Sequence, residues 1–131
     1  MSNPNELLER YAIELDTDTQ VDITNIMEKQ LSAPNVKHKW LYKLTQAKQQ
    51  MLKLMYARDE IRQTIIDSNN LPISDVVLKR KSSNDPRIIA LEKDIAQYQI
   101  LVDYLDVAVK QINQIGFDFK NIVELMKMEN L

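Results

Sequence analysis

The side chains that usually perform catalysis are scarce in this chain of 131 residues. It has one histidine, one glycine and no cysteine. The histidine, His38, stands between Lys37 and Lys39, where a solvated position on a helix surface is favoured over a catalytic or pH-sensing role. No glycine-rich loop is present to hold a phosphate group. The sequence therefore predicts a protein that is not an enzyme and that uses no cofactor.

Carboxylates near the N-terminus offer a weak metal-binding pattern. Asp16, Asp18 and Asp22 faintly resemble the start of a helix-loop-helix calcium site. Val21, however, stands where the sharp turn needs glycine, and Met27 stands where the bidentate glutamate belongs. We expect no metal site here.

Basic residues are concentrated in one stretch. The net charge is −5 over residues 1–31, +5 over residues 32–62 and −2 over the rest, and no acid occurs between Glu28 and Asp59. On a helix, one face of this stretch would be cationic and rich in amides, with the residues Lys39, Tyr42, Lys43, Gln46, Gln49, Gln50 and Lys53. Lysines attract phosphates and an exposed tyrosine can stack on a base, as in proteins that bind single strands. Ordinary solvated faces mix charges of both signs, so the acid-free run favours nucleic acid over that alternative.

A second basic cluster, Lys79-Arg80-Lys81, lies in a polar segment that we expect to be a flexible connector. The predicted contacts to single-stranded DNA are then Lys37, Lys39, Tyr42, Lys43, Lys53, Arg58, Arg62, Lys79, Arg80 and Lys81.

The elements that position these residues are all predicted to be helical, because glycine is rare and apolar residues recur with helical spacing. The expected all-α fold has two long antiparallel amphipathic helices, short N-terminal helices and a C-terminal oligomerisation helix. We expect a single domain over residues 1–131, divided into acidic N-terminal helices (1–34), a basic long helix (35–68), a connector (69–85), a heptad helix (86–115) and a C-terminal assembly helix (116–131). Asn3 with Pro4, and Asp85 with Pro86, are typical helix starts. Pro34 should end the second N-terminal helix.

Heptad spacing defines an apolar seam on each long helix. The first seam comprises Trp40, Leu44, Ala47, Met51, Leu54, Arg58, Ile61 and Ile65, and the second comprises Ile88, Leu91, Ile95, Tyr98, Val102, Leu105, Val109 and Ile112. Leu101, Ala108 and Ile115 widen the second seam. Core packing is the favoured role of Trp40. The charge of Arg58 must either pair with an acid of a neighbouring helix or mark a place where the seam opens.

The C-terminal segment is short and strongly apolar. Gly116 is expected to end the preceding helix in a left-handed conformation. A helix this short is marginal by itself, so it must dock, and docking on another subunit is favoured. The predicted oligomerisation residues are Phe117, Phe119, Ile122, Val123 and Met126.

Taken together, these residues resemble the UvsY family of phage recombination mediators. The matching residues are Lys39-Trp40-Leu41, Lys43, Met51-Leu52, Tyr98, Ile100-Leu101, Asp103, Ala108, Ile112, Gly116-Phe117, Lys120 and Ile122. The resemblance covers most of 36–67 and 85–128, and no single motif is diagnostic. It implies a cofactor-free protein that binds single-stranded DNA, forms a ring-shaped homo-oligomer (a hexamer or heptamer), contacts the phage recombinase and the phage single-strand-binding protein, and acts in the cytoplasm of the infected bacterial host.

One departure from the family concerns a Lys-Ala-Arg element late in the first long helix, which contributes to DNA binding there. Gln63, Thr64 and Ile65 stand at the matching positions, with Arg58 and Arg62 just upstream. The resemblance predicts a mediator that loads the phage recombinase onto strands covered by single-strand-binding protein. The alternative is a helical protein-interaction or structural assembly module that does not bind DNA. No apolar run is long enough to span a bilayer, so no membrane contact is expected.

Overall fold

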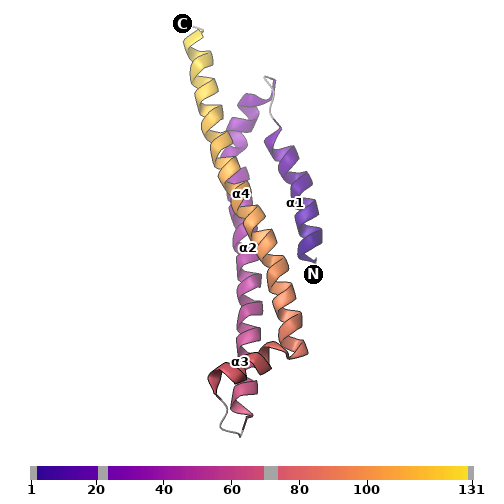
Figure 1. Ribbon diagram of the computed structural model, residues 1–131. Helices are drawn as coiled ribbons and strands as arrows, with labels where there is room; N and C mark the ends of the chain where they lie inside the picture. The colour runs from indigo at the N-terminus through magenta and orange to yellow at the C-terminus, as the bar shows by residue number, and fades with distance from the viewer. Residues whose placement is uncertain (1–2, 21–23, 70–73, 130–131) are drawn as a thin grey trace. The chain divides into compact units, whose positions relative to one another are not determined.

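A computed structural model describes residues 3–20, 24–69 and 74–129, and within these ranges every regular element is an α-helix. The helices are α1 (Pro4–Thr19), α2 (Ile26–Asp67), α3 (Asp75–Ser83) and α4 (Pro86–Glu129), as Figure 1 shows. The chain divides into two compact units. Residues 1–46 and 101–131 form the first, and residues 47–100 form the second. The predicted all-α fold is confirmed.

Helix α1 starts as its sequence predicts. The Asn3 side chain accepts a hydrogen bond of 2.8 Å from the Asn5 N–H, and Pro4 occupies the first turn, where its missing N–H costs nothing. Only one of its 16 residues, Leu15, is fully buried, and Ile13 is 73% exposed. Leu7, Leu8 and Tyr11 are half-buried, so the apolar contact of α1 is a narrow one centred on Leu15.

The N-terminal boundary predicted for the long basic helix is wrong. Helix α2 begins at Ile26, not near Asn35, and Pro34 lies inside it and does not end a separate short helix. An internal proline costs about 3 kcal/mol because it lacks an N–H and clashes with the preceding turn. Burial on both sides of it, at Ile26 and at Trp40, offsets that cost.

Helix α4 also contradicts a predicted boundary, because it runs through Gly116 to Glu129. Gly116 is helical, with no positive φ. A helical glycine costs only about 1 kcal/mol relative to alanine. The buried residues Ile112 and Val123 lie on either side of it, so packing sustains the helix across this position. The predicted cap at the other end is confirmed, since Asp85 Oδ1 accepts a 2.8 Å hydrogen bond from the Arg87 N–H.

The predicted connector 69–85 contains helix α3 over residues 75–83, an element that the sequence analysis did not predict. Leu78 and Ser82 are buried, four residues apart on one face of α3. The Ser82 hydroxyl donates to the Lys79 carbonyl at 2.9 Å, which satisfies it inside the fold. An apolar anchor and a satisfied polar group therefore hold this short helix in place.

The two heptad seams are the faces that the fold covers. In the first unit the buried seam positions are Trp40, Leu44, Val102, Leu105 and Ile112, and Leu101 and Ala108 are buried beside the second seam. In the second unit Ala47 and Ile88 are buried, and the other seam residues from Met51 to Ile65 and from Leu91 to Tyr98 are half-buried. Off-seam residues such as Ile89, Ile100 and Val107 are more than half exposed. The predicted core positions are thus confirmed for most of the first unit, whereas most seam positions of the second unit are only half-buried.

Candidate nucleic-acid interface

In the first unit, two of the predicted DNA contacts lie open on α2. Lys37 is exposed and Tyr42 is 57% exposed. Among the described residues no acid lies within ion-pair distance of Lys37. A lysine with no local counter-charge keeps its full attraction for a phosphate, and an exposed ring can stack on an unpaired base.

Two other predicted contacts in this unit, Lys39 and Lys43, are already paired with acids of α1. Lys39 Nζ lies 3.0 Å from Glu14 Oε1 and 2.6 Å from Asp18 Oδ2, and Lys43 Nζ lies 3.4 Å from Glu14 Oε2. Lys43 Nζ also sits 4.6 Å from the ring centre of Tyr11 on α1, within cation–π distance. Helix α1 therefore covers part of the predicted DNA-binding face of α2.

Trp40 is fully buried beneath the same helix, as predicted. Its indole N–H donates a 2.8 Å hydrogen bond to Asp18 Oδ2, and its ring meets Tyr11 edge-on with centroids 6.0 Å apart. A buried tryptophan needs a partner for its N–H, and Asp18 supplies it. In this arrangement the Trp40 ring is not available to a ligand.

The pKa values of this cluster follow its charges. Burial by itself raises the pKa of Glu14, but hydrogen bonds and charge from Lys39 and Lys43 outweigh it, and the pKa lies below its usual 4.5. Burial likewise lowers the pKa of Lys39, but its bonds to Asp18 and Glu14 prevail, and the pKa lies above 10.5. Both groups are thus held in their charged forms.

In the second unit, Lys48 and Lys53 are exposed on α2, with no acid within ion-pair distance among the described residues. Arg58 Nη1 and Arg62 Nη2, by contrast, both lie 3.1 Å from Glu92 Oε1 of α4. Of the two sequence interpretations of Arg58, pairing with a neighbouring helix is therefore the one that the structure bears out. DNA contact by Arg58 and Arg62 stays a prediction, and it would compete with Glu92.

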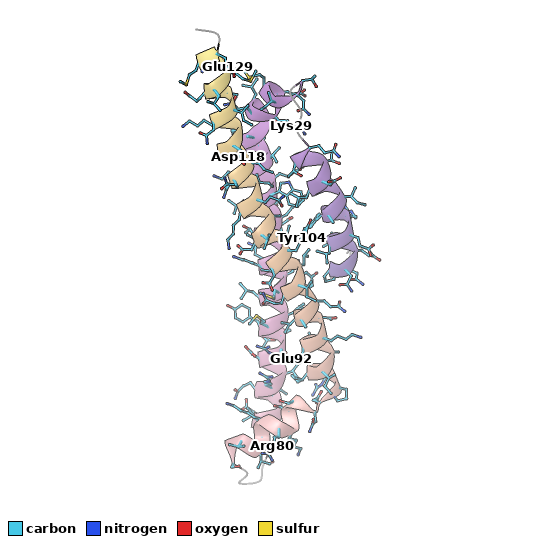
Figure 2. The ribbon with its side chains drawn as sticks, turned by 45° about the horizontal axis from the view of Figure 1, so that its top comes forward. Lys29, Arg80, Glu92, Tyr104, Asp118 and Glu129 are labelled. Carbon is cyan, nitrogen blue, oxygen red and sulfur yellow. The ribbon has the colours of Figure 1, made fainter. Side chains whose placement is uncertain are left out.

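The second basic cluster lies on α3. Lys79, Arg80 and Lys81 are all exposed, and Figure 2 shows the Arg80 side chain on the outside of this helix. Arg80 and Lys81 belong to the last turn of α3, where positive charge complements the helix dipole. The cluster is therefore held on a regular element, although the sequence placed it in a loop.

A groove in the first unit adds a cation that sequence analysis did not select. Lys37 of α2 and Lys120 of α4 line it together with the amides of Gln30 and Asn113, and no acidic residue takes part. Lys120 lies 83 residues from Lys37 in the chain, so no local pattern could have brought the two together. Lys48 was also missed, although the acid-free run contains it.

The C-terminal part of α4 keeps an exposed apolar face. Ile122 is 42%, Met126 38%, Leu125 60% and Met128 67% exposed. Val123, which was predicted to mediate oligomerisation, is 7% exposed and already covered within the chain. The side chains of Phe117 and Phe119, the remaining two predicted residues, lie outside what the structure describes. Self-association through this segment stays a prediction.

Residues 3–20, 24–69 and 74–129 contain no group of three or more acids, histidines or cysteines placed to hold a metal ion. Within the same ranges, no helix is long and apolar enough to cross a membrane.

Comparison with known protein families identifies the family of this chain. Residues 14–130 match the family model described as the recombination, repair and ssDNA binding protein UvsY. The chain belongs to the UvsY family. No curated protein sequence matches it.

Solved structures with the same fold belong to UvsY as well. The chain is similar to the recombination mediator protein UvsY of bacteriophage T4 in lattice type IV, with 23% identity and a TM-score of 0.79 over 93% of this chain and 98% of that chain. The T4 protein in lattice type II gives 20% identity and a TM-score of 0.77, over 94% of this chain and 97% of that one. The fold predicted from the UvsY resemblance is thus confirmed over nearly the whole length of both chains.

Proposed function

We propose that this UvsY family member is a recombination mediator that binds single-stranded DNA and promotes loading of the phage recombinase onto strands covered by single-strand-binding protein. It acts without catalysis or cofactor, as a homo-oligomer in the cytoplasm of the infected bacterial host. Family membership over residues 14–130 carries the proposal.

Exposed cations support the DNA-binding part of this proposal. Lys37 in the first unit and Lys48 and Lys53 in the second are the members of the acid-free run of α2 that are exposed and have no ion pair among the described residues. Lys79, Arg80 and Lys81 on α3 add a separate basic cluster. Each exposed lysine that meets a phosphate releases a counterion, so binding should weaken steeply as salt rises.

The first test is fluorescence anisotropy of a labelled single-stranded oligonucleotide, titrated with the protein at several salt concentrations beside a duplex of equal length. The triple variant Lys37→Gln, Lys48→Gln and Lys53→Gln should bind the single strand at least about tenfold more weakly. Its slope of log K against log salt should be smaller by about 2, the value for three lost phosphate contacts on a single strand.

The matched control is Lys93→Gln, Lys110→Gln and Lys127→Gln, which removes the same charge from exposed positions of α4. We expect a small, general electrostatic loss from this variant. Equal losses in the two variants would show that net charge, and not the α2 face, determines binding. If the unmodified protein (the parent) does not bind the single strand at low salt, DNA binding is rejected. The alternative function, a protein-interaction module, then remains.

Recombinase loading is tested by the DNA-dependent nucleotide hydrolysis of the recombinase on strands first covered by single-strand-binding protein. The parent should shorten the lag before hydrolysis begins, and the α2 triple variant should restore the lag. A lag that the parent leaves unchanged would exclude the loading role and retain DNA binding alone.

A further inference from the structure

Helix α1 covers two cations on the acid-free face of α2. The cations it covers, Lys39 and Lys43, belong to the acid-free face of α2, and the groups that cover them are the carboxylates of Glu14 and Asp18. Carboxylate and phosphate oxygens compete for the same ammonium groups because both are anionic acceptors. The carboxylates of α1 therefore neutralise Lys39 and Lys43 as DNA phosphates would.

Beneath the ion pairs lies Trp40, an aromatic ring of the kind on which unpaired bases stack. Trp40 is fully buried, and its polar contact is to Asp18 of α1. The Tyr11 ring lies edge-on to it at 6.0 Å, and Lys43 Nζ lies 5.6 Å from the Trp40 ring centre. Aromatic rings flanked by lysines are the usual elements of a single-strand site. Here Trp40 and Lys43 of α2 are covered by α1, the helix that carries Tyr11.

The attachment of α1 combines a narrow apolar contact with a set of polar ones. Leu15 is its only fully buried residue, whereas the contacts to α2 include three ion pairs, the indole hydrogen bond and a 3.4 Å hydrogen bond from Lys29 Nζ to the Thr17 carbonyl. Partly exposed ion pairs are individually weak and are screened by salt. Such an attachment is open to competition from a polyanion in a way that a large apolar interface is not.

We propose that Lys39, Trp40 and Lys43 form a second, covered site for single-stranded DNA, and that α1 is an internal competitor that the strand displaces from it. The idea rests on the DNA binding proposed above. The open lysines of α2 make the first contacts, and the phosphates then replace Glu14 and Asp18 on Lys39 and Lys43. Trp40 loses its bond to Asp18, and the part of its ring that α1 covers becomes exposed to a base.

The test is the double variant Glu14→Gln and Asp18→Asn. It removes both charges, nearly preserves side-chain shape and leaves an amide oxygen to accept from the Trp40 indole. Without its competitor the site should bind a single strand about three- to tenfold more tightly than the parent, the range that two or three partly exposed ion pairs correspond to. The gain should shrink as salt rises, because salt weakens the same pairs in the parent.

The matched control is the double variant Glu6→Gln and Glu9→Gln, which removes the same charge from α1. Both residues are exposed, and among the described residues neither forms an ion pair with α2. Trp40 is the only tryptophan, so its emission reports the site directly. In the parent, DNA should quench and shift this emission as α1 leaves.

The outcomes separate the two proposals. A parent that binds no single strand rejects the proposed DNA-binding function. A parent that binds DNA, while the Glu14 and Asp18 variant gains no more than the control and Trp40 emission stays constant, rejects the covered site alone. Circular dichroism and thermal unfolding of both variants establish that each remains folded.

Discussion

At the scale of single residues, Glu92 forms ion pairs with two arginines of the second unit. One of its carboxylate oxygens lies 3.1 Å from both Arg58 Nη1 and Arg62 Nη2. The Arg58 side chain is only 16% exposed and stands at a seam position, where its charge needs partners: Glu92, and Asp59, whose Oδ1 lies 3.1 Å from Arg58 Nε. The pair thus makes a charged residue tolerable in an apolar seam.

Glu92→Gln should lower the free energy of unfolding by about 1 kcal/mol, because Arg58 then keeps a half-buried charge with a weaker partner. Arg58→Met should cost less, since methionine fits the apolar spacing between Leu54 and Ile61. Chemical denaturation of both variants and of the double variant measures the coupling. The control is Asp106→Asn, which breaks the exposed ion pair with Lys110. It should change the free energy of unfolding by only a few tenths of a kcal/mol. Additive effects of Glu92→Gln and Arg58→Met would contradict this account.

Glu14 gives the attachment of α1 a pH dependence. Its pKa is lower in the folded protein than its usual 4.5, so the charged form stabilises the fold. That stabilisation is complete above about pH 4.5 and is lost as the pH falls through the lower, folded value. Trp40 emission and melting temperature, followed from pH 6 down to pH 3, should both change in this window. Glu14→Gln should diminish the change and the exposed control Glu9→Gln should not. Identical pH profiles for the two variants would assign the transition to other groups.

At the scale of elements, α2 and α4 both continue through residues that ordinarily end helices. Pro34 lies inside α2 and Gly116 lies inside α4. Local preference disfavours both residues in a helix interior, but each lies between buried positions of the first unit's core. Packing along the rest of the helix therefore outweighs the local cost.

Gly116→Ala should stabilise the protein by about 0.5–1 kcal/mol, because alanine loses less backbone entropy in a helix. A Cβ built at this position meets nothing within 4 Å, so no clash opposes the gain. Urea unfolding of the variant measures it, with the exposed substitution Gln111→Ala as a control for an ordinary helix position. Destabilisation by Gly116→Ala would mean that this residue needs a conformation other than helical.

At the scale of the whole molecule, the surface still exposes apolar side chains on the last part of α4. Leu125 and Met128 are 60% and 67% exposed, and Ile122 lies beside them at 42%. Clustered apolar residues at the end of a helix are typical of surfaces that another chain covers. This feature supports the proposed homo-oligomer and leaves the number of subunits to measurement.

Replacing Ile122 and Leu125 with aspartate should dissociate the oligomer, because an interface that buries these positions would have to bury two new carboxylates. Size-exclusion chromatography with light scattering should show a much smaller particle and a weaker affinity for single-stranded DNA through lost avidity. Val76→Asp with Ile89→Asp, at exposed apolar positions of the second unit, is the control. An unchanged particle mass in the Ile122 and Leu125 variant would place the subunit contacts elsewhere.

What the sequence determined was periodic and local. Heptad spacing predicted that Trp40, Leu105 and Ile112 lie in the core, and Asn3 and Asp85 predicted two helix starts. Each of these signals depends on residues within a few turns of the chain. The resemblance to UvsY likewise depended on residues in local register. The helix ends at Pro34 and Gly116 were wrong because tertiary packing overrides a local penalty of a few kcal/mol.

Only the tertiary structure decided which cations are free. The acid-free run made Lys37, Lys39, Lys43 and Lys53 look equivalent, yet α1 neutralises two of them and leaves the other two open. The pairing of Glu14 with Lys39 and of Glu92 with Arg58 joins residues distant in the chain, and charge patterns along a sequence carry no record of such contacts. Ion pairs form wherever packing of the apolar seams happens to bring opposite charges within a few ångströms, so their partners follow from the fold and not from the spacing.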